Sequence, residues 1–206
     1  MHLAIFGGTG HTGRHLVDQA LGRGHRVTML ARDPARLPAR PHLHVVEGDV
    51  RDAEPVARTV AGADVVISAL GQRRWGTTVC TDGMRTILPA MAAHEVSRLV
   101  ALSNYGTADS RRPGLYSTTA WLAIRSIMRD KERMEELIRA GDTAWTIVRP
   151  AALTDGPHTA HYRTGTDLRL TFGSRITFAD LADCMLAQLG TDEYVHKAVA
   201  VGPARG

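Results

Sequence analysis

Short apolar runs alternate along the chain with longer stretches in which apolar residues recur every three or four positions. The short runs predict β-strands and the longer stretches predict amphipathic helices. In residues 13–24, for example, the apolar side chains fall on one helical face, and Gly22 and Gly24 then predict the end of the helix. Strands are expected at 3–6, 26–32, 42–50, 64–70, 98–104, 144–150 and 197–201, and helices at 13–24, 55–62, 77–96, 119–141 and 178–189.

Several of these strands are apolar on both faces, as "DVVISAL" at 64–70 illustrates. Continuous apolar strands that alternate with helices are typical of a parallel sheet covered on both sides. We therefore expect residues 1–206 to form a single α/β domain with a doubly wound, mostly parallel sheet and helices on both faces. Two long irregular stretches, 105–118 and 151–176, follow strands at the sheet edge where such folds bind ligands, and we expect them to form a substrate pocket.

The stretch "HLAIFGGTGHTGRHL" (2–16) places Gly7, Gly10 and Gly13 between the first strand and the first helix. Gly7 allows a tight turn, Gly10 lets the backbone approach a pyrophosphate, and Gly13 lets the helix pack closely on the strand. The unpaired N–H groups and the positive dipole end of the helix suit an anion. A glycine-rich turn without a ligand is the alternative, but the order of strand, turn, helix and strand predicts dinucleotide binding and a Rossmann fold.

The expected cofactor groove comprises this turn, where the hydroxyls of Thr9 and Thr12 add donors, and residues at the ends of neighbouring strands. Its members are Gly7, Thr9, Gly10, His11, Thr12, Gly13, Arg32, Arg36, Asp49, Val50, Ala69, Leu70, Gly71 and Pro150. The ten histidines show no metal-ligand spacing, so we expect no metal site.

The end of the second strand, "LARDPARLP", indicates which dinucleotide binds. An acidic residue at this place binds a ribose 2′-hydroxyl, whereas an arginine accommodates a 2′-phosphate. Arg32 and Arg36 offer planar forks of donors to one phosphate and favour NADP (NADPH). In the alternative, Arg36 is a solvated surface residue and Asp33 binds the ribose of NAD, although Asp33 is equally well placed to cap a helix.

The composition is that of an ordinary globular protein, with 44% apolar and 22% charged residues and a net charge of +4. Because the basic residues are spread along the chain, we expect a small-molecule substrate and no nucleic acid. Apolar runs stay well below the ~20 residues of a membrane span, and no signal peptide is expected. Cys80 and Cys184 lie far apart and suit a reducing compartment, so we expect a cytoplasmic monomer or homodimer without membrane contact.

The motifs "GGTGHTG", "LARDPARLP", "EGDV", "WTIVRP" and "LTDGP" resemble the atypical short-chain dehydrogenase/reductases of the NmrA-like NAD(P)-binding type. Over almost the whole chain the pattern is most similar to the biliverdin-IXβ reductase or NADPH-dependent flavin reductase group. This resemblance implies NADPH in the groove and a shallow, permissive substrate site over the nicotinamide. That group has a serine after the fifth strand and a histidine after the sixth, which align with Asn104 and Ala152. Ser103 is a candidate replacement for the hydroxyl, and His158 and His161 lie just downstream of the histidine position.

The Tyr-x-x-x-Lys motif of the wider superfamily is absent, because Ile127 stands four positions before Lys131. Reduction of a simple carbonyl makes an alkoxide that needs a positioned proton donor. A reduced flavin or quinone is a delocalised anion that water can protonate, and positioning then supplies much of the rate. We therefore expect an NADPH-dependent reductase of a flavin, a quinone or a related conjugated acceptor.

The expected catalytic residues are Asn104 and Ser103, and the expected substrate-binding residues are Tyr105, Ala151, Ala152 and Arg175. Arg175 is placed to attract an anionic acceptor such as a flavin phosphate. The alternatives are that Tyr105 serves loop packing and that Arg175 is a solvated charge. At the level of the whole protein, the alternatives are a non-catalytic NADP(H)-binding sensor or regulator and a redox or isomerisation step in a biosynthetic pathway.

Overall fold

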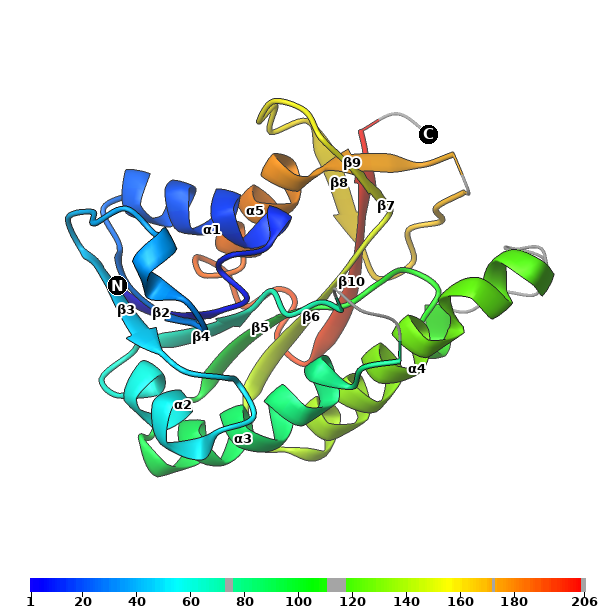
Figure 1. The fold of residues 1–206 in the computed structure, drawn as a ribbon. Helices are drawn as coiled ribbons and strands as arrows, with labels where there is room; N and C mark the ends of the chain where they lie inside the picture. The colour runs from blue at the N-terminus through cyan, green and yellow to red at the C-terminus, as the bar shows by residue number, and fades with distance from the viewer. Residues whose placement is uncertain (73–75, 111–117, 172, 205–206) are drawn as a thin grey trace.

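An eight-stranded sheet forms the centre of the molecule (Figure 1), with the strand order β3-β2-β1-β4-β5-β6-β10-β8. The structure is a computed structural model that describes residues 1–72, 76–110, 118–171 and 173–204, without the side chains of residues 36 and 118–124. The strands of this sheet are β1 (His2–Phe6), β2 (Arg26–Ala31), β3 (Leu43–Glu47), β4 (Val65–Ser68), β5 (Arg98–Leu102), β6 (Ala144–Pro150), β8 (Tyr162–Gly165) and β10 (Lys197–Pro203).

Every neighbouring pair in this sheet is parallel except the pair of β10 and β8, which is antiparallel. The expected doubly wound, mostly parallel sheet is therefore confirmed. The chain runs outward from β1 to β3 on one side and from β4 to β6 on the other. The strand order thus reverses between β1 and β4, and the carboxyl edge at such a reversal is where open α/β sheets bind ligands.

Helices cover both faces of the sheet, as Figure 1 shows, with α1 and α5 on one face and α2, α3 and α4 on the other. The helices are α1 (His11–Gly22), α2 (Ala53–Val60), α3 (Val79–Ala93), α4 (Thr118–Ala140) and α5 (Phe178–Ala187), and short 3-10 turns occur at Pro34–Arg36 and Ala108–Ser110. Along β1, Leu3 and Ile5 pack in the core on the α1 and α5 side, while Ala4 and Phe6 pack in the core on the other side. The strands are apolar on both faces because each face is buried under a helical layer.

The segment 151–176, expected to be irregular, contains three short strands. Strand β7 (Ala152–Thr154) pairs in parallel with β9 (Arg175–Thr177), and β8 forms the antiparallel edge of the main sheet. The other expected loop, 105–118, lies in part outside the described residues, since 111–117 are not described. In the described part of the chain, no helix is both long and apolar enough to cross a membrane, and no cluster of residues suited to a metal ion occurs.

Candidate cofactor groove and active site

The glycine turn joins the end of β1 to the start of α1 at very short range. Gly7 has a φ of +82°, and a Cβ atom there would lie 2.5 Å from the carbonyl oxygen of Ala69. A Cβ atom on Gly13 would lie only 2.0 Å from the carbonyl oxygen of Gly7. Backbone atoms cannot move aside cheaply in a packed interior, so both positions require glycine for the helix and strand to meet.

Gly10 differs from the other two, because a Cβ atom there would find only the carbonyl oxygen of Gly7 within contact range, at 3.3 Å. Gly10 is the N-cap of α1, and no side chain caps the helix at this position. The first-turn N–H groups of a helix have no intrahelical partner and carry the positive end of the dipole. The bare backbone at Gly10 beside these donors forms a cradle that fits a pyrophosphate.

The side chains next to this turn have separate surroundings. The imidazole of His11 stacks on the ring of Phe178 in α5, with the ring centroids 5.0 Å apart. Thr12 is buried. His11 therefore joins the start of α1 to the start of α5 beside the glycine turn.

The ends of β2 and β3 lie side by side and carry charged side chains. Arg32 and Asp33 follow β2 and are exposed. The Asp49 carboxylate, which follows β3, accepts the backbone N–H of Arg51 at 3.0 Å and its Nε at 2.9 Å. The side-chain hydrogen bond from Arg51 lowers the pKa of Asp49, and the charge of Arg32 acts in the same direction. Arg32 and Arg51 thus both act on one carboxylate, whereas the side chain of Arg36 lies outside the described part of the structure.

Arg51 is a candidate groove residue that the sequence analysis missed. What points to Arg51 is its paired hydrogen bonds to Asp49, which only the structure shows. In the sequence, an arginine two residues after an aspartate is an ordinary surface pattern. The predicted neighbour Val50 is buried and contributes to the core beneath α3.

The end of β4 is tied to the end of β5 by a buried lysine. Lys131, on α4, is 3% exposed, and its Nζ donates to the carbonyl oxygens of Leu70 at 2.7 Å and Leu102 at 2.5 Å. Ala69 and Leu70 are themselves buried, and Gly71 is exposed. Lys131 therefore fixes the backbone just after β4 and at the end of β5. The residue four positions before it is Ile127, not a tyrosine.

The two predicted catalytic residues face different environments. Ser103 is fully buried, and its Oγ donates to the carboxylate of Glu135 at 2.6 Å. Asn104 is half-buried, and its Nδ2 lies 3.9 Å from the Sδ of Met128. Its backbone carbonyl oxygen accepts the hydroxyl of Thr107 at 2.8 Å. Of the two, only Asn104 has a side chain in reach of solvent.

The predicted substrate residues come together from two segments. The backbone N–H of Tyr105 donates to the carbonyl of Pro150 at 3.1 Å, so the end of β5 meets the end of β6. The Tyr105 ring is buried in the core, and its hydroxyl accepts the backbone N–H of Leu170 at 3.3 Å. Loop packing therefore accounts for this side chain. Ala152 lies opposite Arg175 in the β7–β9 pair, and both are exposed.

The two histidines downstream of β6 lie against the α1 and α5 layer. The Nε2 of His158 is 3.2 Å from the Asp183 carboxylate of α5, which also accepts the Tyr162 hydroxyl at 2.5 Å and pairs with Arg23 of α1. The Nδ1 of His161 lies 2.7 Å from the carbonyl oxygen of Thr159. These contacts anchor the segment after β7 to the helices and give neither imidazole a role next to Asn104.

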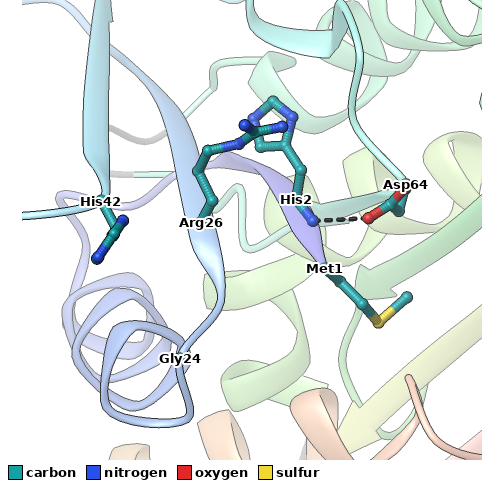
Figure 2. Close-up of a pocket in the computed structure, with 6 residues that line it drawn as sticks. All are labelled: Met1, His2, Gly24, Arg26, His42 and Asp64. Atoms are coloured by element: carbon teal, nitrogen blue, oxygen red, sulfur yellow. Dashed lines mark hydrogen bonds between the residues drawn. The ribbon is translucent and has the colours of Figure 1, made fainter.

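A surface pocket of about 430 Å³ opens at the amino ends of β1 and β2 (Figure 2). It is lined by Met1, His2, Gly24, Arg26, His42 and Asp64. The backbone N–H of His2 donates to the Asp64 carboxylate at 2.7 Å within it. The glycine turn follows the carboxyl end of β1, so this pocket lies at the opposite edge of the sheet and is separate from the cofactor groove.

A doubly wound sheet with a glycine turn and an uncapped helix at its switch point defines a dinucleotide-binding α/β protein. The profile of the family described as NAD(P)H-binding matches residues 7–192, and the chain belongs to that family. The dinucleotide is therefore a nicotinamide cofactor. The match starts at the first glycine of the turn and extends beyond α5, so it takes in most of the described sheet.

Known proteins resemble the chain over nearly its whole length. Protein YwnB of Bacillus subtilis (strain 168) is 23% identical over 211 residues, which cover 98% of each chain. A 3-diazoavenalumate denitrifying reductase of a Streptomyces species is 28% identical over 221 residues, covering 97% of this chain and 71% of the relative. The solved structure of ChuY, an anaerobillin reductase from Escherichia coli O157:H7, superposes with a TM-score of 0.85 at 21% identity, covering 100% of this chain and 98% of that chain. The expected Rossmann fold is thereby confirmed.

Proposed function

We propose that the protein is an NADPH-dependent reductase that delivers a hydride to a flavin, a quinone or a related conjugated acceptor. Membership of the NAD(P)H-binding family supports the cofactor, and two similar proteins carry reductase names. The bare backbone at Gly10 supports the placement of the pyrophosphate, and Arg32 supports a 2′-phosphate at the end of β2. When bound, the reduced nicotinamide supplies the hydride, and the chain supplies position and electrostatics.

The hydrogen bonds already made by the nearby proton donors support a conjugated acceptor over a simple ketone. The Lys131 ammonium is 3% exposed and donates to two backbone carbonyls, and the Ser103 hydroxyl donates to a buried carboxylate. Neither group is therefore presented to a substrate as an acid. A simple ketone would gain a localised alkoxide charge that needs such an acid. A conjugated ring spreads the charge and can take its proton from solvent.

Asn104 is the residue that we place beside the acceptor. Its amide can donate one hydrogen bond and accept another, but it cannot supply a proton at neutral pH. It therefore orients the acceptor and stabilises charge through hydrogen bonding. Arg175, exposed on β9 opposite Ala152, is placed to attract an acceptor that carries a phosphate or a carboxylate.

Steady-state reduction of FMN, menadione and an unactivated ketone tests this function. We expect NADPH-dependent turnover of FMN or menadione and little turnover of the ketone. Asn104→Ala should lower turnover by about tenfold, less than the 10²–10⁴ typical of a lost general acid. Asn104→Ser is the matched variant, because it keeps a hydrogen-bonding group at this position, and it should retain more activity than Asn104→Ala.

Efficient turnover of the ketone, or a thousandfold loss in Asn104→Ala, would show that a proton donor acts in this site and would contradict the proposal. Tight NADPH binding without turnover of any acceptor would instead favour a non-catalytic NADP(H)-binding regulator. Calorimetric measurement of NADPH affinity in each variant separates a lost catalytic contact from a lost cofactor site.

A further inference from the structure

A buried ionic network lies directly behind Asn104. Glu135 of α4 is 1% exposed and Arg149 of β6 is 3% exposed. The Nε of Arg149 donates to Oε1 of Glu135 at 3.1 Å, and its Nη2 donates to Oε2 at 2.5 Å. A charge this deeply buried is tolerated only when it is paired and hydrogen-bonded. The fork of two parallel bonds meets that requirement for both partners.

The network extends from this pair into the segment 103–110. Oε1 of Glu135 also accepts the hydroxyls of Ser103 at 2.6 Å and Thr107 at 2.9 Å. On the other side, Nη2 of Arg149 donates to Asp109 at 2.6 Å. Burial acts to lower the pKa of Arg149, but its hydrogen bonds to Glu135 and Asp109 outweigh burial and raise it. Burial acts to raise the pKa of Asp109, but its hydrogen bond from Arg149 outweighs burial and lowers it.

These contacts surround Asn104 in the sequence and in space. Ser103 precedes Asn104 and is held by Glu135, while the Thr107 hydroxyl lies within hydrogen-bonding distance of both Glu135 and the Asn104 carbonyl. Arg149 precedes Pro150, whose carbonyl accepts the Tyr105 N–H. One carboxylate thus fixes the backbone on both sides of the proposed acceptor-binding amide.

We propose that Glu135 is a positioning residue that sets the place of Asn104 relative to the carboxyl ends of β5 and β6. This inference rests on the proposed function, which is what places Asn104 beside the acceptor. Because Glu135 is almost fully buried, it acts through the residues that it holds and not by direct contact with a bound molecule. A buried ion pair is a weak source of stability compared with apolar packing. The three residues that hydrogen-bond with its carboxylate, Ser103, Thr107 and Arg149, all lie next to or near Asn104 or Pro150, which gives Glu135 a use in orienting the loop.

Glu135→Gln tests the proposal, with Glu136→Gln as the matched control on the exposed face of the same helix. The glutamine keeps an oxygen for one donor but places an N–H₂ group among the others. We expect turnover of the acceptor to fall roughly 10- to 100-fold, as a misplacement of about 1 Å can produce. The Kd for NADPH should change by less than about twofold, because the glycine cradle and Arg32 lie on other elements. Glu136→Gln should leave both values unchanged.

A second readout does not depend on activity. Hydrogen exchange at the amides of Tyr105, Gly106 and Thr107 should become at least about tenfold faster in Glu135→Gln and should not change in Glu136→Gln. If wild-type protein reduces none of the acceptors, the proposed function fails, while the exchange data still decide whether Glu135 holds this loop. A folded Glu135→Gln variant with wild-type turnover, or with unchanged exchange at these amides, would overturn the proposal.

Ser103→Ala provides a milder variant if Glu135→Gln does not fold. It removes one donor to Glu135 and leaves the ion pair with Arg149 intact. The proposal requires smaller changes in the same direction: faster amide exchange at Tyr105 to Thr107 and lower turnover than in wild-type protein. The affinity for NADPH should not change. Unchanged exchange in Ser103→Ala would overturn the proposal.

Discussion

At the scale of single residues, the three glycines of the turn serve different purposes, and the structure separates them. Gly13 has no room for a side chain, since a Cβ atom would lie 2.0 Å from the Gly7 carbonyl oxygen. At Gly10 a Cβ atom would make one tight contact, with the Gly7 carbonyl oxygen at 3.3 Å, which a shift of a few tenths of an ångström relieves. The sequence spacing treats the two glycines alike, whereas the coordinates show that the packing of the turn excludes a side chain at Gly13 and constrains Gly10 far less.

Substitution by valine at the two positions should therefore have different effects, on stability at Gly13 and on NADPH binding at Gly10. Gly13→Val should destabilise the fold by at least about 3 kcal/mol, at the upper end of the range for overpacking. Gly10→Val should remain folded and lose NADPH binding, because its side chain occupies the space of the pyrophosphate. Urea unfolding and calorimetric titration measure the two effects. Normal NADPH binding by Gly10→Val would show that the dinucleotide lies elsewhere.

Arg32 should decide between the two nicotinamide dinucleotides. Wild-type protein should bind NADPH more tightly than NADH, and Arg32→Asp should reverse the order. Loss of a charge-assisted hydrogen bond to phosphate costs about 1.5–3 kcal/mol, or roughly 10- to 100-fold in affinity. Arg26→Asp is the control, because Arg26 is an exposed arginine at the other end of β2. Equal affinities of wild-type protein for the two cofactors would rule out this assignment.

At the scale of elements, α3 begins on a carboxylate that comes from α4. Asp130, 2% exposed, accepts the backbone N–H groups of Cys80 at 3.0 Å and Thr81 at 2.9 Å. It also accepts the Thr81 hydroxyl at 2.6 Å and the side-chain amide of Gln72 at 3.2 Å. The aspartate thus acts as an N-cap supplied by a different helix, and it joins the two helices near the end of β4.

Asp130→Asn should lower the free energy of unfolding by about 1–3 kcal/mol at pH 7, because one amide group then faces donors. Burial alone would raise the pKa of Asp130, but the hydrogen bonds from Thr81, Cys80 and Gln72 lower it below its ordinary value. Stability from this group is therefore present above pH ~4 and is lost as the pH falls through the depressed pKa.

The acid-induced loss of stability should consequently be smaller in Asp130→Asn than in wild-type protein. Urea unfolding at pH 7 and pH 3 measures it, with the exposed residue Asp142 replaced by Asn as the control. Identical pH dependence in Asp130→Asn and wild type would show that this carboxylate does not carry the effect.

The long periodic elements could be predicted from the sequence, and the short ones could not. Strand β6 occupies 144–150 as expected, and α4 ends at Ala140, one residue before Gly141. Strands β7, β8 and β9 have three or four residues each and lack an apolar run. Their pairing comes from partners elsewhere in the chain, such as β10 for β8, which no local pattern records.

At the scale of the whole molecule, the glycine turn and its fold were more predictable from the sequence than the buried charged residues near Asn104. The glycine turn is a local pattern with its own physical reason, and the family match supports it. Lys131 and Glu135, by contrast, read as an ordinary charged pair on a helix surface. A signal was present, because they share a helical face with Met134 and Ile138, which are both buried. A charged residue on an apolar helix face is expected to be buried with a partner of opposite charge. For Glu135 that partner is Arg149, 14 residues further along the chain.

The position of β10 between β6 and β8 determines the order in which the protein can assemble during translation. Strands β1 to β4 have all of their strand partners once residue 102 has left the ribosome, whereas α4, which packs on α3, and α5, which packs on α1, are still to be made. Strand β8 pairs with the main sheet through β10, which begins 32 residues after β8 ends. In a nascent chain the pairing of β1 to β4 is therefore complete before β8 and β10 can close the other edge of the sheet.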